Sequence, residues 1–492
     1  MKKIRQLAGQ TVVYGMGTMV PRLLNYLLLT PFYTRVFERN EYGMFSELYS
    51  YTAILLVLLT YGMETAFFRF SISEKNPEKV YGTALISLLT TSLLFVITVL
   101  IFLTPISNVI RYGNRPDYVL YLTLIIVFDA VTAISFAKLR YNNKALKFAV
   151  IKISNIIVTI GIVMFFLWFC PMFLQKYPES IIGKIYSPQI GIGYAFIANL
   201  AGCIIQLLLL LPEMFPVKIK FDGQLLFRML LYSWPLVIVG LGGAINENAD
   251  KILLKYLLPN GQNPLIQVGI YAASYKVAVL MLIFVQMFRY AAEPFYFVNA
   301  KDQESAELFA EVMKYFVIFG LFIFLGVMLF MDVIKYFIGV DFRSGLQIVP
   351  IILISYLFFG IISNLSIWYK LENKTLYGAC ITAMGATITI AVNVSLIPIM
   401  GYMASAWATL ACYTGMMFIS YFWGQRHFKI NYNVKKMAIY FTIAMGIYFG
   451  SIKIDFGNGK FLINLILFAA FVVIVSSREN VCGILRIKGN TP

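Results

Sequence analysis

The sequence predicts an all-α integral membrane protein with about 14 transmembrane helices. Its composition, its recurring apolar runs and the placement of its charges each point to this class. Hydrophobic residues fill 60% of the 492 positions and charged residues only 13%, whereas soluble domains are about 45–50% apolar and about 25% charged. The mean hydropathy of +0.79 agrees. A chain this apolar needs lipid around most of its surface.

Apolar runs of membrane-spanning length recur along the whole chain. A spanning helix needs about 20 mostly apolar residues. We expect spans at about 9–36, 43–70, 82–105, 117–137, 148–170, 191–211, 228–257, 268–293, 312–331, 346–369, 376–397, 402–423, 436–452 and 460–476. The first run lacks a small-residue cleavage site after a short apolar core, so we expect a retained signal anchor.

The net charge of +17 is explained by topology rather than by nucleic-acid binding. Basic residues concentrate in alternate connections, at Lys2, Lys3, Arg5, Lys138, Arg140, Lys144, Lys147, Lys218, Lys220, Arg426, Lys429, Lys435, Lys436, Arg478, Arg486 and Lys488. The intervening loops hold far fewer. This is the positive-inside pattern, and it predicts that both termini lie in the cytoplasm.

An internal repeat divides the chain. Pro21 in "MVPRLLNY" and Pro235 in "YSWPLVIVG" occupy comparable depths in the first and seventh spans, and Gly43 in "EYGMFSELYSY" aligns with Gly269 in "QVGIYAASYKVA". We therefore expect two six-helix lobes around a central cavity, at residues 1–212 and 213–425. Residues 426–492 add two further spans and a cytoplasmic tail. Repeated halves are common in transporters, where the substrate site lies between them.

Charged residues inside the spans mark the expected cavity. Ionisable side chains near a bilayer centre are costly and usually face a polar cavity or a partner. The segment "GGAINENADKILLKYLLP" (242–259) places Asn246, Glu247, Asp250 and Lys251 on one helical face. Other spans contribute further polar residues, namely Arg22, Asn25, Arg35, Glu64, Arg69, Asp129, Lys276, Arg289 and Glu293.

Such a cavity suits a large anionic ligand. Arginine and lysine favour phosphate or carboxylate groups, and nearby aromatic side chains such as Tyr26 and Trp234 offer flat faces to sugar rings. Structural alternatives remain open: Glu247, Asp250 and Lys251 as an interhelical network, Arg35 and Arg289 as side chains that snorkel to an interface, and Asp129 as a helix contact.

Catalytic motifs are not found in the sequence. His427 is the one histidine and lies in a basic loop, so histidine-based chemistry has almost no candidates. The cysteines follow neither a metal-binding nor a disulfide spacing. We expect no enzyme activity, no cofactor and no metal.

Three segments resemble a known family. "LLNYLLLTPFYTRVFERNEYGMFSELYSY", "NENADKILLKYLL" and "VGIYAASYKVAVLM" are similar to the Wzx-type polysaccharide flippases of the multidrug/oligosaccharidyl-lipid/polysaccharide (MOP) exporter superfamily. The resemblance implies a carrier in the bacterial cytoplasmic (inner) membrane. It would move undecaprenyl-diphosphate-linked oligosaccharide to the periplasmic leaflet by alternating access without ATP, with membrane lipid, a polysaccharide polymerase and assembly proteins as partners.

The resemblance also assigns roles to residues. Asp250 and Lys251 match the acidic–basic pair of the family, and Arg22, Arg35, Arg69 and Lys276 correspond to its basic cavity residues by position. The substrate-binding candidates are the basic residues Arg22, Arg35, Arg69, Lys251, Lys276 and Arg289, together with the neutral Asn25. If transport is coupled to an ion gradient, the carboxylates expected to take part are Glu64, Asp129, Glu247 and Asp250.

Three other functions compete with flippase activity. One is a non-transporting scaffold for the envelope assembly machinery, which would tolerate neutralisation of Arg22 and Lys276. A drug or cation antiporter of the same superfamily would prefer an acidic cavity, which the basic residues here count against. A membrane polysaccharide polymerase or ligase would need substantial outward loops, and the longest one expected is 171–190. The sequence leaves the sugar unit, the coupling ion and the oligomeric state open.

Overall fold

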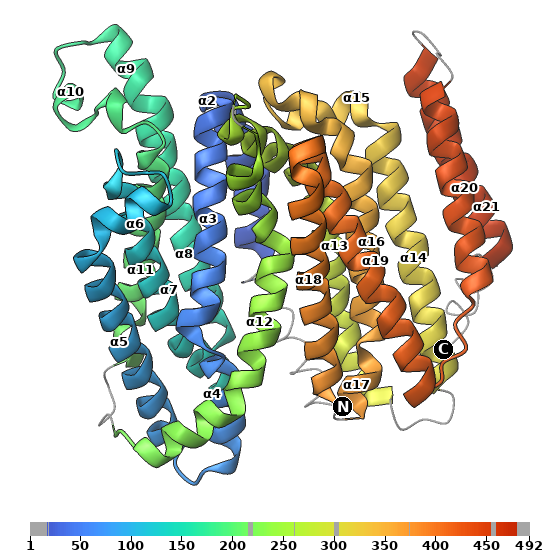
Figure 1. Ribbon diagram of the computed structural model, residues 1–492, viewed down its shortest axis with the longest axis horizontal. Coiled ribbons are helices and arrows are strands. Elements are labelled where there is room, and N and C mark those ends of the chain that lie inside the picture. The colour runs from blue at the N-terminus through green and yellow to red at the C-terminus, as the bar shows by residue number, and fades with distance from the viewer. Residues whose placement is uncertain are drawn as a thin grey trace, which may run out of the picture. The chain divides into compact units, whose positions relative to one another are not determined.

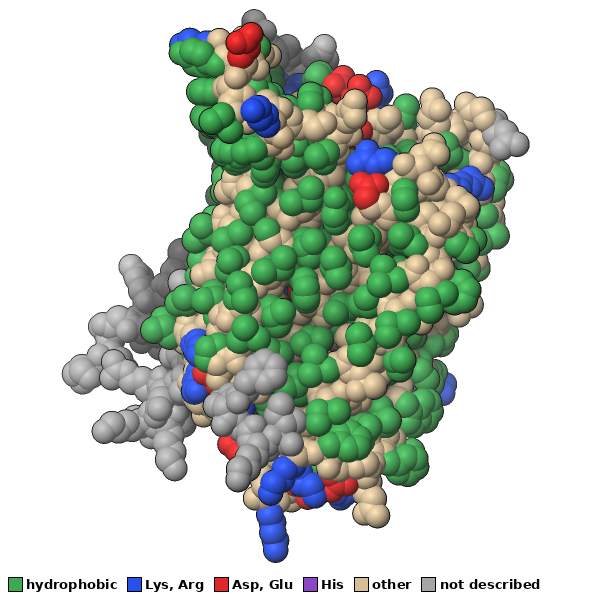
Figure 2. All heavy atoms as spheres, turned by 90° about the vertical axis from the view of Figure 1, so that its left-hand side faces the viewer, with side chains coloured by type: hydrophobic (Ala, Val, Ile, Leu, Met, Phe, Trp, Pro, Cys, Tyr) green, Lys and Arg blue, Asp and Glu red, His purple; other side chains and the backbone are tan. Residues whose placement is uncertain are grey.

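The structure is a computed structural model that describes residue 17 and residues 19–214, 220–259, 261–299, 305–372, 374–453 and 459–479. Within these ranges every regular element is a helix, which confirms the predicted all-α class. Eleven of the described helices are long and apolar enough to cross a membrane. One face shows a broad band of hydrophobic side chains, with charged side chains gathered toward its two ends (Figure 2). The chain is a multi-pass membrane protein.

The predicted spans agree with the helices in position. Span 228–257 corresponds to helix α12 (Gly223–Leu257), and span 268–293 to α13 (Pro264–Asn299). Helices α19 (Tyr402–His427) and α20 (Val434–Lys453) match the twelfth and thirteenth spans in place and length, although they are not among the eleven helices that are long and apolar enough to cross a membrane. The first span lies partly outside the described residues, so the total of about 14 stays a prediction.

By packing, the chain forms two compact units (Figure 1). Unit 1 is Met1–Ala272 with Asn393–Gly401, and unit 2 is Ala273–Val392 with Tyr402–Pro492. Helix α12 therefore belongs to unit 1. The predicted boundaries at residues 212 and 425 follow the internal repeat rather than packing, and they stay a prediction.

Unit 1 contains the elements from η1 to α12 and the start of α13. They are η1 (Asn25–Leu29), α2 (Thr30–Val36), α3 (Arg39–Thr60), α4 (Met63–Ser73), α5 (Pro77–Ile101), α6 (Leu103–Val109), α7 (Pro116–Tyr141), α8 (Ala145–Met164), η2 (Phe165–Phe169), α9 (Cys170–Lys176), α10 (Ile182–Ile185), η3 (Pro188–Ile190), α11 (Gly193–Met214) and α12. Its core is formed by buried side chains of α4, α5, α7, α8, α11 and α12, including Phe67, Tyr81 and Met229.

Local sequence explains where these helices begin and end. Tyr61 and Gly62 adopt positive φ angles of 32° and 69°, which separate α3 from α4; glycine adopts this conformation without strain. The side chain of Asp222 caps α12 by accepting a hydrogen bond from the backbone N–H of Leu225 at 3.0 Å. The ammonium of Lys79, 2.6 Å from the carboxylate, lowers the pKa of Asp222.

Two glycines bring the backbones of α3 and α13 into direct contact within unit 1. A Cβ atom on Gly43 would collide with the carbonyl oxygen of Leu265, and one on Gly269 with the carbonyl oxygen of Arg39. Small residues permit such close approach between membrane helices. Gly43 and Gly269 are the positions that the internal repeat aligns, so the repeat-related glycines pack against each other.

Unit 2 contains the rest of α13 and the elements that follow it. They are α14 (Ser305–Leu329), α15 (Met331–Ile334), η4 (Lys335–Phe337), η5 (Val340–Ile348), α16 (Val349–Leu365), α17 (Ile367–Leu371), α18 (Thr375–Met400, whose last residues belong to unit 1), α19, α20 and α21 (Lys460–Glu479). Helix α16 packs against α14 and α19, and α20 and α21 pack on α14.

Ion pairs hold both ends of α21, to α15 at its start and to α14 and α20 at its end. Near the start of α21, Lys460 lies 2.8 Å from Asp332, and Lys460 holds the pKa of Asp332 below its usual value. At the other end the carboxylate of Glu479 binds Lys314 at 2.8 Å and Lys436 at 2.7 Å. The two helices that follow the predicted second lobe are therefore an integral part of unit 2.

Candidate functional site

The polar segment of α12 forms a compact buried network in unit 1. The ammonium of Lys251 lies 3.0 Å from Asp250 Oδ1 and 3.0 Å from the backbone carbonyl oxygen of Glu247. The hydroxyl of Tyr271, on α13, donates to Asp250 Oδ2 at 2.5 Å. Both carboxylate oxygens of Asp250 therefore have donors. The predicted acidic–basic pair is an ion pair that also joins α12 to α13, and Asn246 is buried on the same helix.

The amino-terminal cations of unit 1 have exposed side chains. Arg22 lies on the helical segment before η1, and Asn25 opens η1, a stretch of wide π-helical backbone that lies against α8. Arg35 is in the last turn of α2, where it donates to the carbonyl oxygen of Pro31 at 2.6 Å. Arg22 and Arg35 therefore lie at opposite ends of a mostly apolar helical segment.

Helix α4 carries two of the predicted site residues. The guanidinium of Arg69 lies 4.4 Å from the ring centroid of Tyr232 on α12, a cation–π contact. Glu64 forms an ion pair with Arg140 of α7. Arg140, which the sequence analysis assigned to topology alone, is thus the ion-pair partner of a candidate coupling carboxylate.

Asp129 lies in a polar cluster in the middle of α7. Cys203 of α11 donates from its Sγ to Asp129 Oδ1 at 3.8 Å. The ammonium of Lys152, on α8, attracts Asp129 electrostatically and donates to Gln206 Oε1 at 3.1 Å. The sequence analysis passed over Lys152, although a single lysine in the apolar run "AVIKISNIIVTIG" was a usable signal.

A second missed feature is the ion pair between Glu47 of α3 and Lys255 of α12. Their side chains are 0% and 4% exposed, and the Lys255 ammonium lies 3.1 and 3.0 Å from the two carboxylate oxygens. Tyr112 also donates to Glu47, and burial raises the pKa of Tyr112, so its hydroxyl keeps its proton. Lys255 stands four residues after Lys251 on the same helix, a spacing that could have revealed it.

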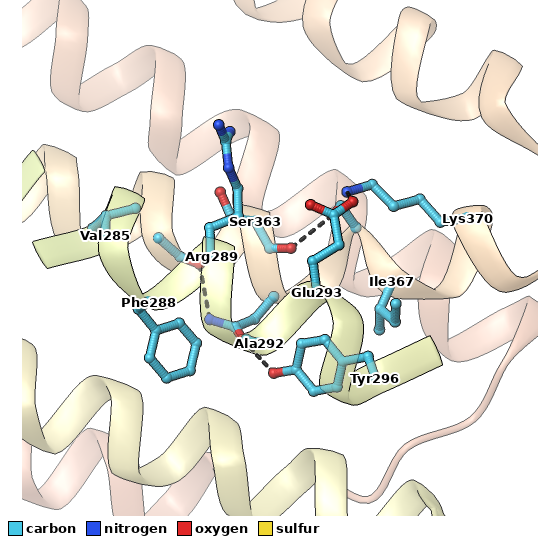
Figure 3. A pocket seen from close by; sticks show the side chains of 12 residues that line it. Val285, Phe288, Arg289, Ala292, Glu293, Tyr296, Ser363, Ile367 and Lys370 are labelled. Carbon is cyan, nitrogen blue, oxygen red and sulfur yellow. Dashed lines mark hydrogen bonds and ion pairs between the residues drawn. The ribbon is translucent and has the colours of Figure 1, made fainter. Parts of the chain in front are cut away.

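Unit 2 holds the two remaining candidates on α13. Lys276 is half-buried. Arg289 and Glu293 line a small polar pocket with Lys370 of α17 (Figure 3). Lys370 forms an ion pair with Glu293 at 2.7 Å. Two further lining residues are joined by a hydrogen bond, which Tyr296 donates to the side-chain oxygen of Asn364.

Metal binding has no support in the described residues, where no group of three His, Cys, Asp or Glu side chains could hold an ion. What the structure does assemble is a set of basic and amide groups within membrane-spanning helices. Such groups can hold an anion by charge-assisted hydrogen bonds.

Three solved structures share this fold. "Lipid II flippase MurJ, inward closed conformation" gives a TM-score of 0.72 at 16% identity, covering 95% of this chain and 98% of that one. An inward-facing multidrug resistance MATE family transporter of the MOP superfamily gives 0.64 at 12% identity, over 85% and 97%. A MATE structure in complex with MaD3S gives 0.60 at 12% identity, over 86% and 95%. At these identities the likeness establishes the fold.

Of the two sequence comparisons, the one with family models gives a match. No curated protein sequence matches the chain. Residues 7–297, more than half of the chain, match a family described as "Polysaccharide biosynthesis protein". The resemblance to the MOP superfamily inferred from the sequence is confirmed. The chain belongs to the polysaccharide biosynthesis protein family, Polysacc_synt.

Proposed function

We propose that this protein is a flippase that moves undecaprenyl-diphosphate-linked oligosaccharide from the cytoplasmic to the periplasmic leaflet for export of surface polysaccharide. The observation that carries the proposal is the set of cations inside membrane-spanning helices of unit 1, in a chain of the polysaccharide biosynthesis family. Arg69, Arg140, Lys152 and Lys251 all lie on such helices. These cations are suited to bind the diphosphate, which is the anionic part of this cargo.

The physical task is to carry a sugar head group past hydrocarbon. Hydroxyl groups transferred without hydrogen-bond partners cost several kcal/mol each, about 4–8 on a cyclohexane scale. A hydrated path lined by cations and amides lowers that barrier for both the sugar and the phosphates. The lipid tail can stay in the bilayer throughout.

Transport proceeds by alternating access between the two lobes of the internal repeat, without ATP. Arg22, Asn25, Arg35, Arg69, Lys251, Lys276 and Arg289 are the proposed cargo-binding residues. Cargo binding alone sets no direction. Consumption of the product outside or an inward ion gradient supplies it, and in the second case Glu64, Asp129, Glu247 and Asp250 are the proposed coupling carboxylates.

The proposed setting is the bacterial inner membrane, with both termini in the cytoplasm. Partners are the lipid-linked oligosaccharide, membrane lipid, and the polymerase and assembly proteins that act on the flipped product. No covalent chemistry on the cargo is required of this chain, so the proposal does not make it an enzyme.

The test is the leaflet distribution of lipid-linked oligosaccharide in cells that lack this protein and any redundant flippase. We expect the cargo to build up on the cytoplasmic side and wild type to clear it. The variant Arg22→Ala, Lys276→Ala should clear it about ten-fold more slowly or worse, since each lost charge-assisted contact is worth about 1.5–3 kcal/mol.

A matched control removes two exposed cations instead. Lys184 and Lys435 have exposed side chains outside the proposed cavity, so Lys184→Ala, Lys435→Ala should clear the cargo as wild type does. A normal leaflet distribution in the deletion strain would overturn the flippase proposal.

Drug or cation antiport is the second candidate, and the fold likeness to MATE transporters favours it. It predicts that the same deletion strain accumulates cationic dyes while its lipid-linked oligosaccharide distributes normally. A polysaccharide polymerase or ligase is a weaker candidate, because such enzymes need substantial outward loops and the longest one expected here is 171–190.

A further inference from the structure

Lys152 has a different kind of hydrogen-bond partner from the neighbouring lysines Lys144 and Lys147. Lys152 donates to Gln206 Oε1 at 3.1 Å, and Gln206 in turn donates from Nε2 to Thr132 Oγ1 at 2.9 Å. Asn155 Nδ2 lies 3.4 Å from the same Gln206 oxygen. A chain of hydrogen bonds across α7, α8 and α11 thus fixes the position of the Lys152 ammonium.

The charge of Lys152 is not neutralised by a direct ion pair. Asp129 attracts the ammonium, but no hydrogen bond joins these two described side chains. Lys144, the residue before α8, and Lys147, in its first turn, both bind the Glu213 carboxylate directly, at 3.0 and 2.8 Å. Lys152 instead has a neutral amide acceptor and lies 4.0 Å from the ring centroid of Phe136.

Further cations surround it. Arg22 and Arg140 both repel Lys152 electrostatically. Arg140 is paired with Glu64, so it contributes little net charge to the cluster. The side chain of Arg22 is exposed, and an anion bound between Arg22 and Lys152 lowers their mutual repulsion. A phosphate group suits a lysine, which acts as a point charge with three donors.

We propose that Lys152 binds a phosphate oxygen of the diphosphate cargo, and that Asp129 competes for its charge until Asp129 takes up a proton. This inference rests on the proposed function and adds to it a binding residue and a competitor. In the empty protein Asp129 and Lys152 attract each other across the cluster. Protonation converts the Asp129 carboxylate to a neutral acid, and Lys152 then attracts the phosphate alone.

Other ionisable groups face the pair from each helix packed around it. They are Cys203 of α11, Tyr49 of α3, Arg140 of α7 itself with its partner Glu64 of α4, and Arg22 from the segment before η1. Asp129 is the one carboxylate of this set without a directly bound cation. Protonation at Asp129 therefore changes the charge felt by Lys152 most.

The experiment measures binding of undecaprenyl diphosphate to the purified full-length protein in nanodiscs between pH 5.5 and 8. We expect wild type to bind more tightly as the pH falls, since protonation removes a competing negative charge. Lys152→Gln should weaken binding about ten-fold or more, and Lys152→Arg should retain most of it. Asp129→Asn should bind at the tighter, low-pH level across the whole range.

Matched controls come from the same helices. Lys147→Gln on α8 removes a lysine that is paired with Glu213, and Asp117→Asn on α7 removes a carboxylate paired with Arg115 at the helix end. Both should bind as wild type does. Thermal melting of each variant confirms that it is folded, and Lys152→Arg keeps the test decisive if Lys152→Gln does not fold.

The outcomes separate this inference from the proposed function. Unchanged binding by Lys152→Gln, or weaker binding by Asp129→Asn, overturns the inference and leaves the flippase proposal to the leaflet assay. Equal binding of inorganic pyrophosphate and undecaprenyl diphosphate supports the site and shows that the phosphates alone are recognised. If wild type binds neither probe, the inference is overturned.

Discussion

Glu47 and Lys255 are the most deeply buried opposite charges among the described ion pairs. Taking two charges out of water is expensive, and their attraction offsets this cost only when the remaining donors and acceptors are also satisfied. Here they are: Tyr112 donates to Glu47, and Lys255 also donates to the carbonyl oxygen of Ile110 at 2.6 Å. The pair therefore tolerates the loss of both charges better than the loss of one.

We expect Glu47→Gln to lower the free energy of unfolding by about 3–5 kcal/mol, because it leaves the Lys255 ammonium buried without a carboxylate. The double variant Glu47→Met, Lys255→Met should recover much of this loss. Thermal melting of the detergent-purified protein measures both. Asp117→Asn is the control, since its partner Arg115 is 34% exposed and such pairs contribute about 1 kcal/mol or less. Equal melting of wild type and Glu47→Gln would contradict this account.

At the scale of helices, the contact between α3 and α13 depends on two glycines. Their backbones approach so closely that no Cβ fits at Gly43 or Gly269 without moving a carbonyl group. Overpacking in a fixed interface costs about 1–3 kcal/mol, since the backbone itself must shift. The two repeat-related positions therefore require glycine because of backbone packing.

Gly43→Ala and Gly269→Ala should each lower the melting temperature. Gly161→Ala on α8 is the matched control, because nothing lies within 4 Å of the added methyl group and alanine is about 1 kcal/mol better than glycine in a helix interior. Gly161→Ala should therefore melt at or above the wild-type temperature. If all three variants melt together, the close approach at Gly43 does not limit stability.

At the scale of the whole molecule, the sequence predicted the positions of the membrane-spanning helices better than it predicted which charged side chains pair with each other. Helix positions followed from apolar length, because the bilayer fixes how many apolar residues a span requires. The pairing of Asp250 with Lys251 followed from their adjacency. Glu47 and Lys255 are 208 residues apart, and their pairing depends on how α3 and α12 rotate against each other. Lys152 had a local signal, a single lysine in an apolar run, but its contacts with Gln206 and Phe136 depend on helix packing that no local pattern shows.

Membrane topology is the property of the whole chain that the charge pattern determines. The helical run Ala145–Lys176 is 32 residues long, which at about 1.5 Å per residue is about 48 Å and exceeds the hydrocarbon thickness of about 30 Å. Its far end, α9, must therefore project from the membrane. Basic side chains flank the turn at its other end, before Ala145, and the positive-inside rule therefore predicts that this turn lies in the cytoplasm.

Cysteine labelling tests this orientation in a background with Cys380→Ala and Cys482→Ala. Of the described cysteines, Cys380 alone is exposed, and Cys482 lies outside the described residues. A membrane-impermeant maleimide should label Gln175→Cys on α9 in intact cells, but Asn142→Cys in the turn between α7 and α8 only after permeabilisation. Val163→Cys, fully buried in α8, should react in neither case. Labelling of Asn142→Cys in intact cells would reverse the orientation, and the direction of the proposed transport would reverse with it.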